Sequence, residues 1–399
     1  MRVLYVQYTN PGAYPPLVRG AQLLAEAGAE VLMLGTHVPG LDALSADDAA
    51  GLEVRLLPSS SEGWRGWRLK ANYARYAAWV ARQGSAWKPD WVYASDVLAA
   101  PVALALGSMA KARTVYHEHD APSLEHDSWT MRQCLAARSH LVRQAAIVIA
   151  PNAERAARLS RDVGGGRAVH TVWNCPRRPV AAPVRDAAGR APGTLNVLFR
   201  GSINAQRLPR TVIDAVARAG DGVALDIVGY ETAGSRGYVD ELLRLASAAG
   251  IDQRVRALGT VPDADLARMC ARFDVGLALM PSESRDVNMQ HMAGASNKLF
   301  EYLAYGIAPL VTDLPDWRTA FVEPGYALSC RPENAESLAG TLVWAASHPT
   351  ELRAMTARGF ERLRQDWNYE TQFAPVMREM GSRGSPGAAL GREEELCAS

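Results

Sequence analysis

Short apolar runs alternate with amphipathic stretches along almost the whole chain. The runs are bounded by turn residues, and the stretches between them repeat apolar positions at helical spacing. This alternation predicts strand–helix–strand units with parallel sheets, and it occurs twice. The strands expected in the first half are residues 2–8, 30–35, 53–57, 91–94, 114–117 and 147–150. Those expected in the second half are residues 195–200, 224–228, 255–258, 275–279 and 308–311.

A segment without apolar periodicity separates the two halves. Residues 176–193 are rich in Pro, Arg, Ala and Gly, which is typical of an interdomain linker. We therefore expect an α/β fold with two Rossmann-like, doubly wound domains, residues 1–175 and 194–366, facing a central cleft. Ligands of such sheets bind at the carboxyl ends of the strands. Residues 381–399 have few large apolar side chains and are predicted to be a disordered tail.

Composition narrows the function classes. The 399 residues include 43 Lys and Arg against 42 Asp and Glu, so no global basic field exists to bind nucleic acid. The five cysteines form no CxxC pair, which fits a reducing cytoplasm. The N-terminal residues lack the pattern of a signal peptide, and no run approaches the roughly 18 apolar residues of a membrane span. We expect a cytoplasmic protein.

The clearest candidate for chemistry is the segment ASNKLFEYLAYG, which begins at residue 295. Ser296 or Asn297 can cap a helix there, and a helix N-terminus suits a phosphate. Lys298 falls in the first turn, where a cation is unfavourable for the helix itself. Two interpretations stay open. Lys298 is a solvated surface lysine with Glu301 as its partner, or it neutralises a diphosphate while Glu301 binds a ribose.

This segment, continuing into a short strand, resembles the donor site of family 4 glycosyltransferases, and the resemblance extends along most of the chain. Phe199, Arg200, Gly201 and Ser202, followed by Arg207, resemble the family's glycine-rich loop, where a basic residue meets the donor pyrophosphate. Arg207 is also expected to open a helix. The resemblance implies a donor site formed by Gly201, Ser202, Arg207, Asn297, Lys298 and Glu301.

The chain departs from the family pattern at two positions. Ser202 stands where many members carry a basic residue, so that diphosphate contact is missing or is supplied by Arg200. Ala293 stands eight positions before Glu301, where the family often has a first glutamate. Only the second glutamate, Glu301, is carried over.

In the first half, His117, Glu118, His119 and Asp120 follow a predicted strand and should lie near the carboxyl edge of its sheet. A metal site, a general acid or base, and polar contacts to the donor are the alternatives. A metal site would want more ligands with defined spacing, and none is predicted. His119 and Asp120 resemble the family's histidine–acid pair, which implies that they are catalytic. His117 takes a position where relatives often have aspartate, and is a further candidate for contact with the sugar.

Two loops offer weaker candidates. The loop after the first strand contains Gly12 and Ala13 but no GxGxxG, which argues against a dinucleotide cofactor. In related glycosyltransferases this loop lies beside the sugar and the acceptor. Glu283 lies in a polar stretch before the donor helix and could contact sugar hydroxyl groups. Trp367 resembles the start of the terminal helix, residues 367–380, which in the family crosses back onto the first domain.

Residues 62–82 interleave aromatic side chains with arginine and lysine. Such a stretch suits the inner membrane face. The alternative is that Tyr76, Trp79 and Val80 face the core while the arginines are solvated. Single-stranded nucleic acid would use the same residue types, but the neutral charge of the chain argues against it.

Taken as a whole, the resemblance implies a GT-B glycosyltransferase of hexosyltransferase type in polysaccharide biosynthesis. It would transfer a sugar with retention from a nucleoside diphosphate donor to a glycan, a lipid-linked or a small-molecule acceptor. Cations and helix dipoles would replace a metal ion, and no cofactor is implied. The alternatives are a nucleotide-sugar epimerase of the same fold and a non-catalytic scaffold that binds sugar nucleotides. The sugar, the base, the acceptor and the oligomeric state stay open.

Overall fold

The computed structural model describes residues 1–37, 51–58, 66–125, 128–184, 193–231, 234–261 and 263–382. The chain forms two compact units. Unit 1 comprises Met1–Ala150, Ala156–Thr171 and Phe373–Ser399, and unit 2 comprises Pro151–Arg155 and Val172–Gln372. Of the predicted tail, only residues 381 and 382 are described, and they end the helix α14 (Tyr369–Ser382). The rest of that tail, and residues 185–192 of the predicted linker, lie outside the described residues.

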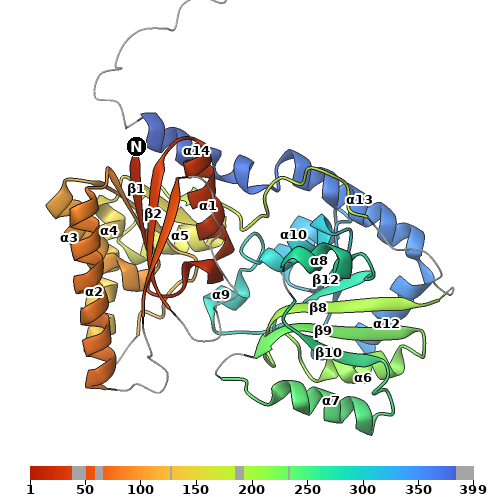
Figure 1. Cartoon of the computed structure of the whole chain (residues 1–399). Helices are drawn as coiled ribbons and strands as arrows, with labels where there is room; N and C mark the ends of the chain where they lie inside the picture. The colour runs from red at the N-terminus through yellow and green to blue at the C-terminus, as the bar shows by residue number, and fades with distance from the viewer. Residues whose placement is uncertain are drawn as a thin grey trace, which may run out of the picture. The chain divides into compact units, whose positions relative to one another are not determined.

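Unit 1 is built on a parallel sheet with the strand order β3-β2-β1-β4-β5-β6-β7 (Figure 1). The direction of winding reverses at β1, which places the switch point between β1 and β4. The six predicted strands are confirmed with small shifts at their ends. Two-residue β7 was missed, because so short a strand has no periodicity to detect. The strands are β1 (Arg2–Val6), β2 (Glu30–Thr36), β3 (Leu52–Leu57), β4 (Trp91–Ser95), β5 (Arg113–His117), β6 (Ile147–Ala150) and β7 (His170–Thr171).

Helices cover both faces of this sheet. On one face, Leu4 and Val6 of β1 share a buried cluster with residues of α2 (Trp67–Trp87), α3 (Ala100–Ala110), α4 (Trp129–Gln144) and α5 (Ala153–Asp162). On the other face lie α1 (Pro15–Glu26) and α14 (Figure 1). Gly20 of α1 lets the helices approach closely, since a Cβ there would lie 3.4 Å from the Phe373 ring. The alternation of buried side chains along β1 therefore sorts the helices into two layers.

Unit 2 repeats the plan with a parallel sheet in the order β10-β9-β8-β11-β12-β13. Its switch point lies between β8 and β11. All five strands predicted for the second half are confirmed, and three-residue β13 was missed. The strands are β8 (Leu195–Ile203), β9 (Val223–Glu231), β10 (Val255–Gly259), β11 (Val275–Ala278), β12 (Ala308–Thr312) and β13 (Leu328–Cys330).

The two faces of the second sheet carry different cores. Val197 and Phe199 pack with α6 (Thr211–Arg218), α7 (Tyr238–Ala248) and α12 (Ala335–Ser347). Leu198 faces the other way, into a core that includes α10 (Asn297–Ala304) and α13 (Pro349–Gln365). The remaining elements of the unit are α8 (Asp263–Cys270), α9 (Val287–Gln290), α11 (Pro315–Trp317) and a single π-helical turn, Arg318–Val322. Helix α10 thus has a packed apolar side beneath its N-terminal turn.

Candidate functional site

The segment around residue 297 forms the predicted helix, α10, directly after an extended Ser296. Ser296 occupies the N-cap position with φ −85° and ψ 122°, but its side chain makes no capping hydrogen bond. Asn297 is the first helical residue and Lys298 the second. The helix ends at Ala304, and Gly306 just beyond it has φ +68°, the left-handed conformation that glycine favours. Backbone N–H groups of the first turn and the Lys298 ammonium therefore share one helix end.

Two glycines make room for Lys298 beside the end of β8. Gly201 has φ +123°, and a Cβ on it would collide with Nζ of Lys298. Gly201 pairs with Gly229 of β9, where a Cβ would in turn collide with the Gly201 carbonyl oxygen. The prediction that Gly201 and Ser202 lie in a loop is wrong, because β8 stays paired with β9 as far as Ile203. Both residues instead form the carboxyl end of a central strand.

Three cationic side chains, Arg200, Arg207 and Lys298, come close together here, and Glu301 lies beside them. Arg200 forms an ion pair with Glu301, whose side chain is 21% exposed. The Lys298 ammonium lies 5.5 Å from the centroid of the Phe199 ring. Burial of the ammonium and the nearby guanidinium of Arg207 lower the pKa of Lys298 to about 7. Lys298 is therefore only partly exposed, and the carboxylate of Glu301 pairs with Arg200.

Arg207 reaches the cluster from a turn and not from a helix. Its backbone N–H donates to both the carbonyl and the side-chain oxygen of Asn204, 3.1 Å away in each case. Pro209 follows, and α6 begins only at Thr211. The prediction that Arg207 opens a helix is therefore wrong, because the Asn204 turn holds this stretch outside α6. A ligand here would meet the guanidinium of Arg207 but not its N–H group.

The position of the missing first glutamate is occupied by a tightly held backbone. The Ala293 N–H donates to the Asp316 carboxylate at 3.1 Å, and its carbonyl accepts from the Asn152 side chain at 2.9 Å. Burial raises the pKa of Asp316. Glu283 is exposed in a bend before α9. The segment before α10 is thus fixed by contacts within unit 2.

At the carboxyl edge of the first sheet, two histidines lie against each other. His117 ends β5 and is fully buried, with the Tyr93 hydroxyl 2.8 Å from its Nδ1. The His119 ring lies 3.8 Å from the His117 ring and 5.5 Å from the Tyr14 ring, between centroids. Burial lowers the pKa of His117 well below its ordinary value, so this ring is neutral. His119 and exposed Asp120 are the outer members of the group.

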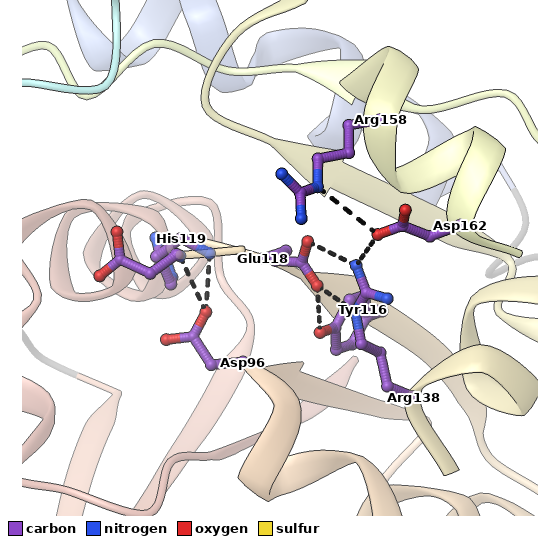
Figure 2. A network of polar contacts seen from close by, with 8 residues as sticks. Asp96, Tyr116, Glu118, His119, Arg138, Arg158 and Asp162 are labelled. Carbon is purple, nitrogen blue, oxygen red and sulfur yellow. Dashed lines mark hydrogen bonds and ion pairs between the residues drawn. The ribbon is translucent and has the colours of Figure 1, made fainter. Parts of the chain in front are cut away.

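Glu118 points away from the histidines into a buried ion network (Figure 2). Arg138 of α4 donates to it through two nitrogens, one of them at 2.8 Å, and the Tyr116 hydroxyl donates at 2.8 Å. Arg138 also pairs with Asp162 at 3.2 Å. The expectation that four titratable side chains gather at the edge is therefore wrong for Glu118. Its carboxylate serves the core.

Asp96 is a member of this edge that the sequence analysis missed. It follows β4, and its carboxylate accepts the N–H groups of His119 and Asp120 at 2.7 and 3.3 Å (Figure 2). Burial raises the pKa of Asp96 well above its usual range, and Asp120 adds to the rise. An acidic residue directly after a strand next to the switch point was the signal that could have revealed it.

The loop after β1 forms a 3-10 turn, Pro11–Ala13, whose N–H groups are already used. The Gly12 N–H donates to the Asn10 side chain at 3.0 Å, and the Ala13 N–H donates to the Asn10 carbonyl at 3.1 Å. These two groups are therefore not donors for a ligand in this conformation. Tyr14, which follows the turn, is the side chain that brings the loop to His119.

In the aromatic and basic stretch, residues 62–82, some of the described aromatic side chains pack in the core and one is exposed. Residues 62–65 lie outside the described residues. In α2, Tyr76 and Val80 are fully buried and Trp79 packs against the same core, as predicted by the alternative in which these three side chains face the core. Trp67, by contrast, is 73% exposed, at the start of the helix. None of the described helices has the length and apolar character required to cross a bilayer.

No group of three or more metal-binding side chains comes together among the residues that the structure describes. The features that do come together are a cation-rich cluster on β8 and α10 in unit 2, and a histidine edge on β4 and β5 in unit 1. We call them the cation cluster (Arg200, Arg207, Lys298 and Glu301) and the histidine edge (Asp96, His117, His119 and Asp120).

Comparison with known proteins gives two family matches. A model described as a glycosyl transferase 4-like domain matches residues 17–176, and one described as glycosyl transferase-like matches residues 206–378. Glycogen synthase from Mycobacterium tuberculosis (strain CDC 1551 / Oshkosh) is 23% identical over 403 aligned positions, which cover 93% of this chain and 92% of the relative.

Solved structures share the fold over nearly the whole chain. Anabaena HepE in complex with UDP and glucose superposes with a TM-score of 0.71 at 18% identity, covering 96% of this chain and 100% of that one. Sucrose-phosphate synthase from Thermosynechococcus elongatus superposes with a TM-score of 0.72 at 15% identity and the same coverage. Both matches extend across unit 1 and unit 2.

Proposed function

Because the chain belongs to the family 4 glycosyltransferases of GT-B fold, we propose that it transfers a sugar, with retention, from a nucleoside diphosphate to a hydroxyl acceptor. The observation that carries the proposal is the cation cluster. Arg200 pairs with Glu301 at the end of β8 and the start of α10, and Arg200 and Arg207 both lie near enough to Lys298 to lower its pKa. A diphosphate supplies negative charge to cations that repel one another.

The cation cluster would act on the leaving group. When the sugar–oxygen bond breaks, negative charge grows on the terminal phosphate, and positive groups fixed nearby stabilise that charge. Lys298, Arg207 and the first N–H groups of α10 would serve in the role that a metal ion has in other transferases. Arg200, which pairs with Glu301, would supply the basic contact to the diphosphate that the uncharged Ser202 cannot make. Glu301 would accept hydrogen bonds from the ribose.

His119 and Asp120 would act on the transferring sugar. His119 would contact the hydroxyl groups of the sugar and help to orient its anomeric carbon. The ring of the buried, neutral His117 packs against the His119 ring. Retention would follow from attack of the acceptor on the face that the diphosphate leaves. The acceptor is a growing glycan, a lipid-linked saccharide or a small molecule.

The donor is tested first by a thermal-shift screen of the purified protein against UDP, GDP, ADP and their sugar conjugates. A ligand that binds only the native state raises its stability, so a selective shift identifies the base. The Anabaena HepE complexes with UDP and UDP-glucose make UDP the first nucleotide to try. Donor turnover that requires an acceptor separates a transferase from an epimerase and from a scaffold.

The residue roles are tested by calorimetry with the selected nucleoside diphosphate. Lys298→Ala and Glu301→Ala should each weaken its binding by roughly tenfold or more while the fold stays intact, since hydrogen bonds to charged groups contribute about 1.5–3 kcal/mol. Arg256→Ala is a matched control, because this arginine pairs with Asp226 on β9. Unchanged affinity in both cluster variants would overturn the donor-site assignment.

We also propose that the first turn of α2 docks on the inner membrane face. Trp67 and Leu69 are 73% and 45% exposed there, and Arg68 and Lys70 beside them are exposed. Such a turn suits an anionic lipid surface. Sedimentation with phosphatidylglycerol vesicles should recover the protein, and Trp67→Ser with Leu69→Ser should abolish recovery. Val343→Ser, which removes an exposed apolar side chain on α12, is the control. Equal recovery of all three proteins would refute docking through this turn.

A further inference from the structure

Asp96 has a backbone conformation that is essentially restricted to glycine. Its φ is 63° and its ψ is 174°, at the junction between β4 and the 3-10 turn Val97–Ala99. Residues with a Cβ are strained in this region, and such strain persists only where the surroundings impose it. The other two non-glycine residues with positive φ among the described residues are Lys88 and Lys111, which end helices in ordinary left-handed caps. Asp96 is a different case.

Three hydrogen bonds tie Asp96 to the strand and loop that carry the histidines. Its backbone N–H donates to the His117 carbonyl at 3.0 Å. Its carboxylate oxygen Oδ1 accepts the N–H groups of His119 and Asp120 (Figure 2). One carboxylate therefore gathers the two consecutive N–H groups of the loop as the chain leaves β5. The strained backbone thus occurs at the residue whose side chain binds that loop.

These contacts hold the backbone of His119, whose ring packs against two others. Its centroid lies 3.8 Å from that of His117 and 5.5 Å from that of Tyr14. His117 belongs to β5, and Tyr14 follows the turn Pro11–Ala13. The His119 ring can therefore reach both only while the His119 backbone keeps its position. The N–H bond to Asp96, at 2.7 Å, is the shorter of the two bonds that the carboxylate accepts.

We infer that Asp96 is a positioning residue for the transfer reaction, which holds the backbone of His119 and Asp120 in the conformation that places the His119 ring against the donor sugar. The inference rests on the proposed function and adds to it a residue that acts through another. This role differs from the one proposed for the cation cluster, which concerns the diphosphate.

Asp96→Gly separates positioning from stability. Glycine adopts the Asp96 backbone conformation without strain, and this relief offsets the loss of the carboxylate bonds. The variant should unfold within about 4 °C of the wild type. Its kcat should fall roughly tenfold to hundredfold, as expected when a reacting group is misplaced, while its Kd for the nucleotide sugar stays within about twofold. Asp96→Asn keeps a side-chain oxygen acceptor and should retain kcat within about threefold.

A readout that does not depend on turnover is the ring of His119 itself. Two-bond ¹H–¹⁵N correlation spectra of the full chain report the tautomer and surroundings of each of the eight histidines. His119→Gln assigns the relevant signals. Asp96→Gly should shift the His119 signals and leave those of His348, stacked on Trp344 in unit 2, unchanged. Asp96→Asn should leave both sets close to the wild type.

The outcomes distinguish the inference from the proposed function. If the wild type turned over no nucleotide sugar with any acceptor, the proposed function would fail, and the His119 signals would still report whether Asp96 places the ring. Wild-type kcat and unshifted His119 signals in Asp96→Gly would overturn the inference. So would a loss of more than about 8 °C in the unfolding temperature of that variant, since Asp96 would then be a stability element.

Discussion

Two clusters of charged side chains, one in each unit, differ in how their charges are balanced. In unit 1, Glu118 and Asp162 face Arg138 and Arg158, so the carboxylates and guanidinium groups are equal in number. Arg138 and Glu118 are buried almost completely, at 1% and 5% side-chain exposure. In unit 2, Arg200 and Arg207 lie near enough to Lys298 to lower its pKa, Glu301 pairs with Arg200, and Arg200 and Glu301 keep 30% and 21% exposure.

Charge balance separates a structural group from a binding group. A balanced, buried network has satisfied its charges within the protein, and it offers nothing to a ligand. An unbalanced and partly open cluster raises the free energy of the empty protein, and an anion lowers it. The depressed pKa of Lys298 expresses this imbalance, because the folded protein disfavours a third positive charge there. Sequence alone treats both groups as similar collections of Arg, Lys and Glu.

The largest expected effect comes from unbalancing the network of unit 1. Arg138→Met leaves the Glu118 carboxylate buried without its main partner, which should lower the free energy of unfolding by about 3–5 kcal/mol. Urea unfolding measures the change. Arg158→Ala, whose nitrogen lies 3.9 Å from Asp162, should cost less than about 1 kcal/mol.

A second substitution checks that charge is the cause. Glu118→Gln in the Arg138→Met protein removes the unpaired carboxylate and should recover part of the lost stability. If the double variant were no more stable than Arg138→Met, lost packing and not buried charge would explain the effect, and the comparison with unit 2 would lose its basis.

The next largest effect comes from displacing Lys298 without touching its charge. Gly201→Ala forces a Cβ into the place of the ammonium and strains a backbone at φ +123°. Unfolding should become easier by about 1–3 kcal/mol, and affinity for the nucleoside diphosphate should fall about tenfold. Gly220→Ala, at φ +89° with no atom within 4 Å of the new Cβ, adds strain alone and should leave affinity unchanged. Equal affinities in the two variants would contradict the placement of Lys298.

The smallest effect is a dependence on pH that the network of unit 1 should not show. With a pKa of about 7, Lys298 is mostly neutral above that pH in the empty protein. A nucleotide sugar favours the charged form, so its affinity should fall by about tenfold as pH rises from 6 to 8.5. Calorimetry of the wild type across that range measures the slope. Lys298→Arg stays charged throughout and should bind with nearly constant affinity; an equal slope in this variant would place the titrating group elsewhere.

The same shift has the opposite sign in the empty protein. The folded pKa of Lys298 lies below the unfolded value, near 10.4, so between about 7 and 10.4 the unfolded chain binds a proton that the folded chain does not. The contribution of Lys298 to stability therefore rises with pH through that window. Raising the pH stabilises the empty site and weakens the bound one.

The strands were predictable because buried parallel strands are continuous apolar runs between turn residues. The end of β8 was not, since Gly201 and Ser202 suggest a loop until the pairing of Gly201 with Gly229 is known, and that pairing is a property of two strands. Helix α10 and its lysine were found from local sequence. The partner of Glu301 was not, because Arg200 lies 101 residues away along the chain and meets it only through the fold.

The histidine edge marks another limit of prediction. His119 and Asp120 were proposed from their likeness to a family motif. Asp96 offered only its place directly after a strand as a signal, and its backbone dihedral and its bonds to the loop are not visible in residue types. Glu118 was grouped with its neighbours in sequence. Side chains alternate along extended chain, however, and its carboxylate meets Arg138 on α4, twenty positions further on.

Unit 1 is formed from separate stretches of the chain, and this affects how the protein folds during its synthesis. Its last helix, α14, carries Phe373, Val376 and Met380, all fully buried, and Glu379, which holds His170 at 2.8 Å. A ribosome makes these residues only after the whole of unit 2. Through most of synthesis, the face of α1 that Phe373 covers therefore stays uncovered, and the nascent chain depends on chaperones, or on speed, to keep that surface from aggregating.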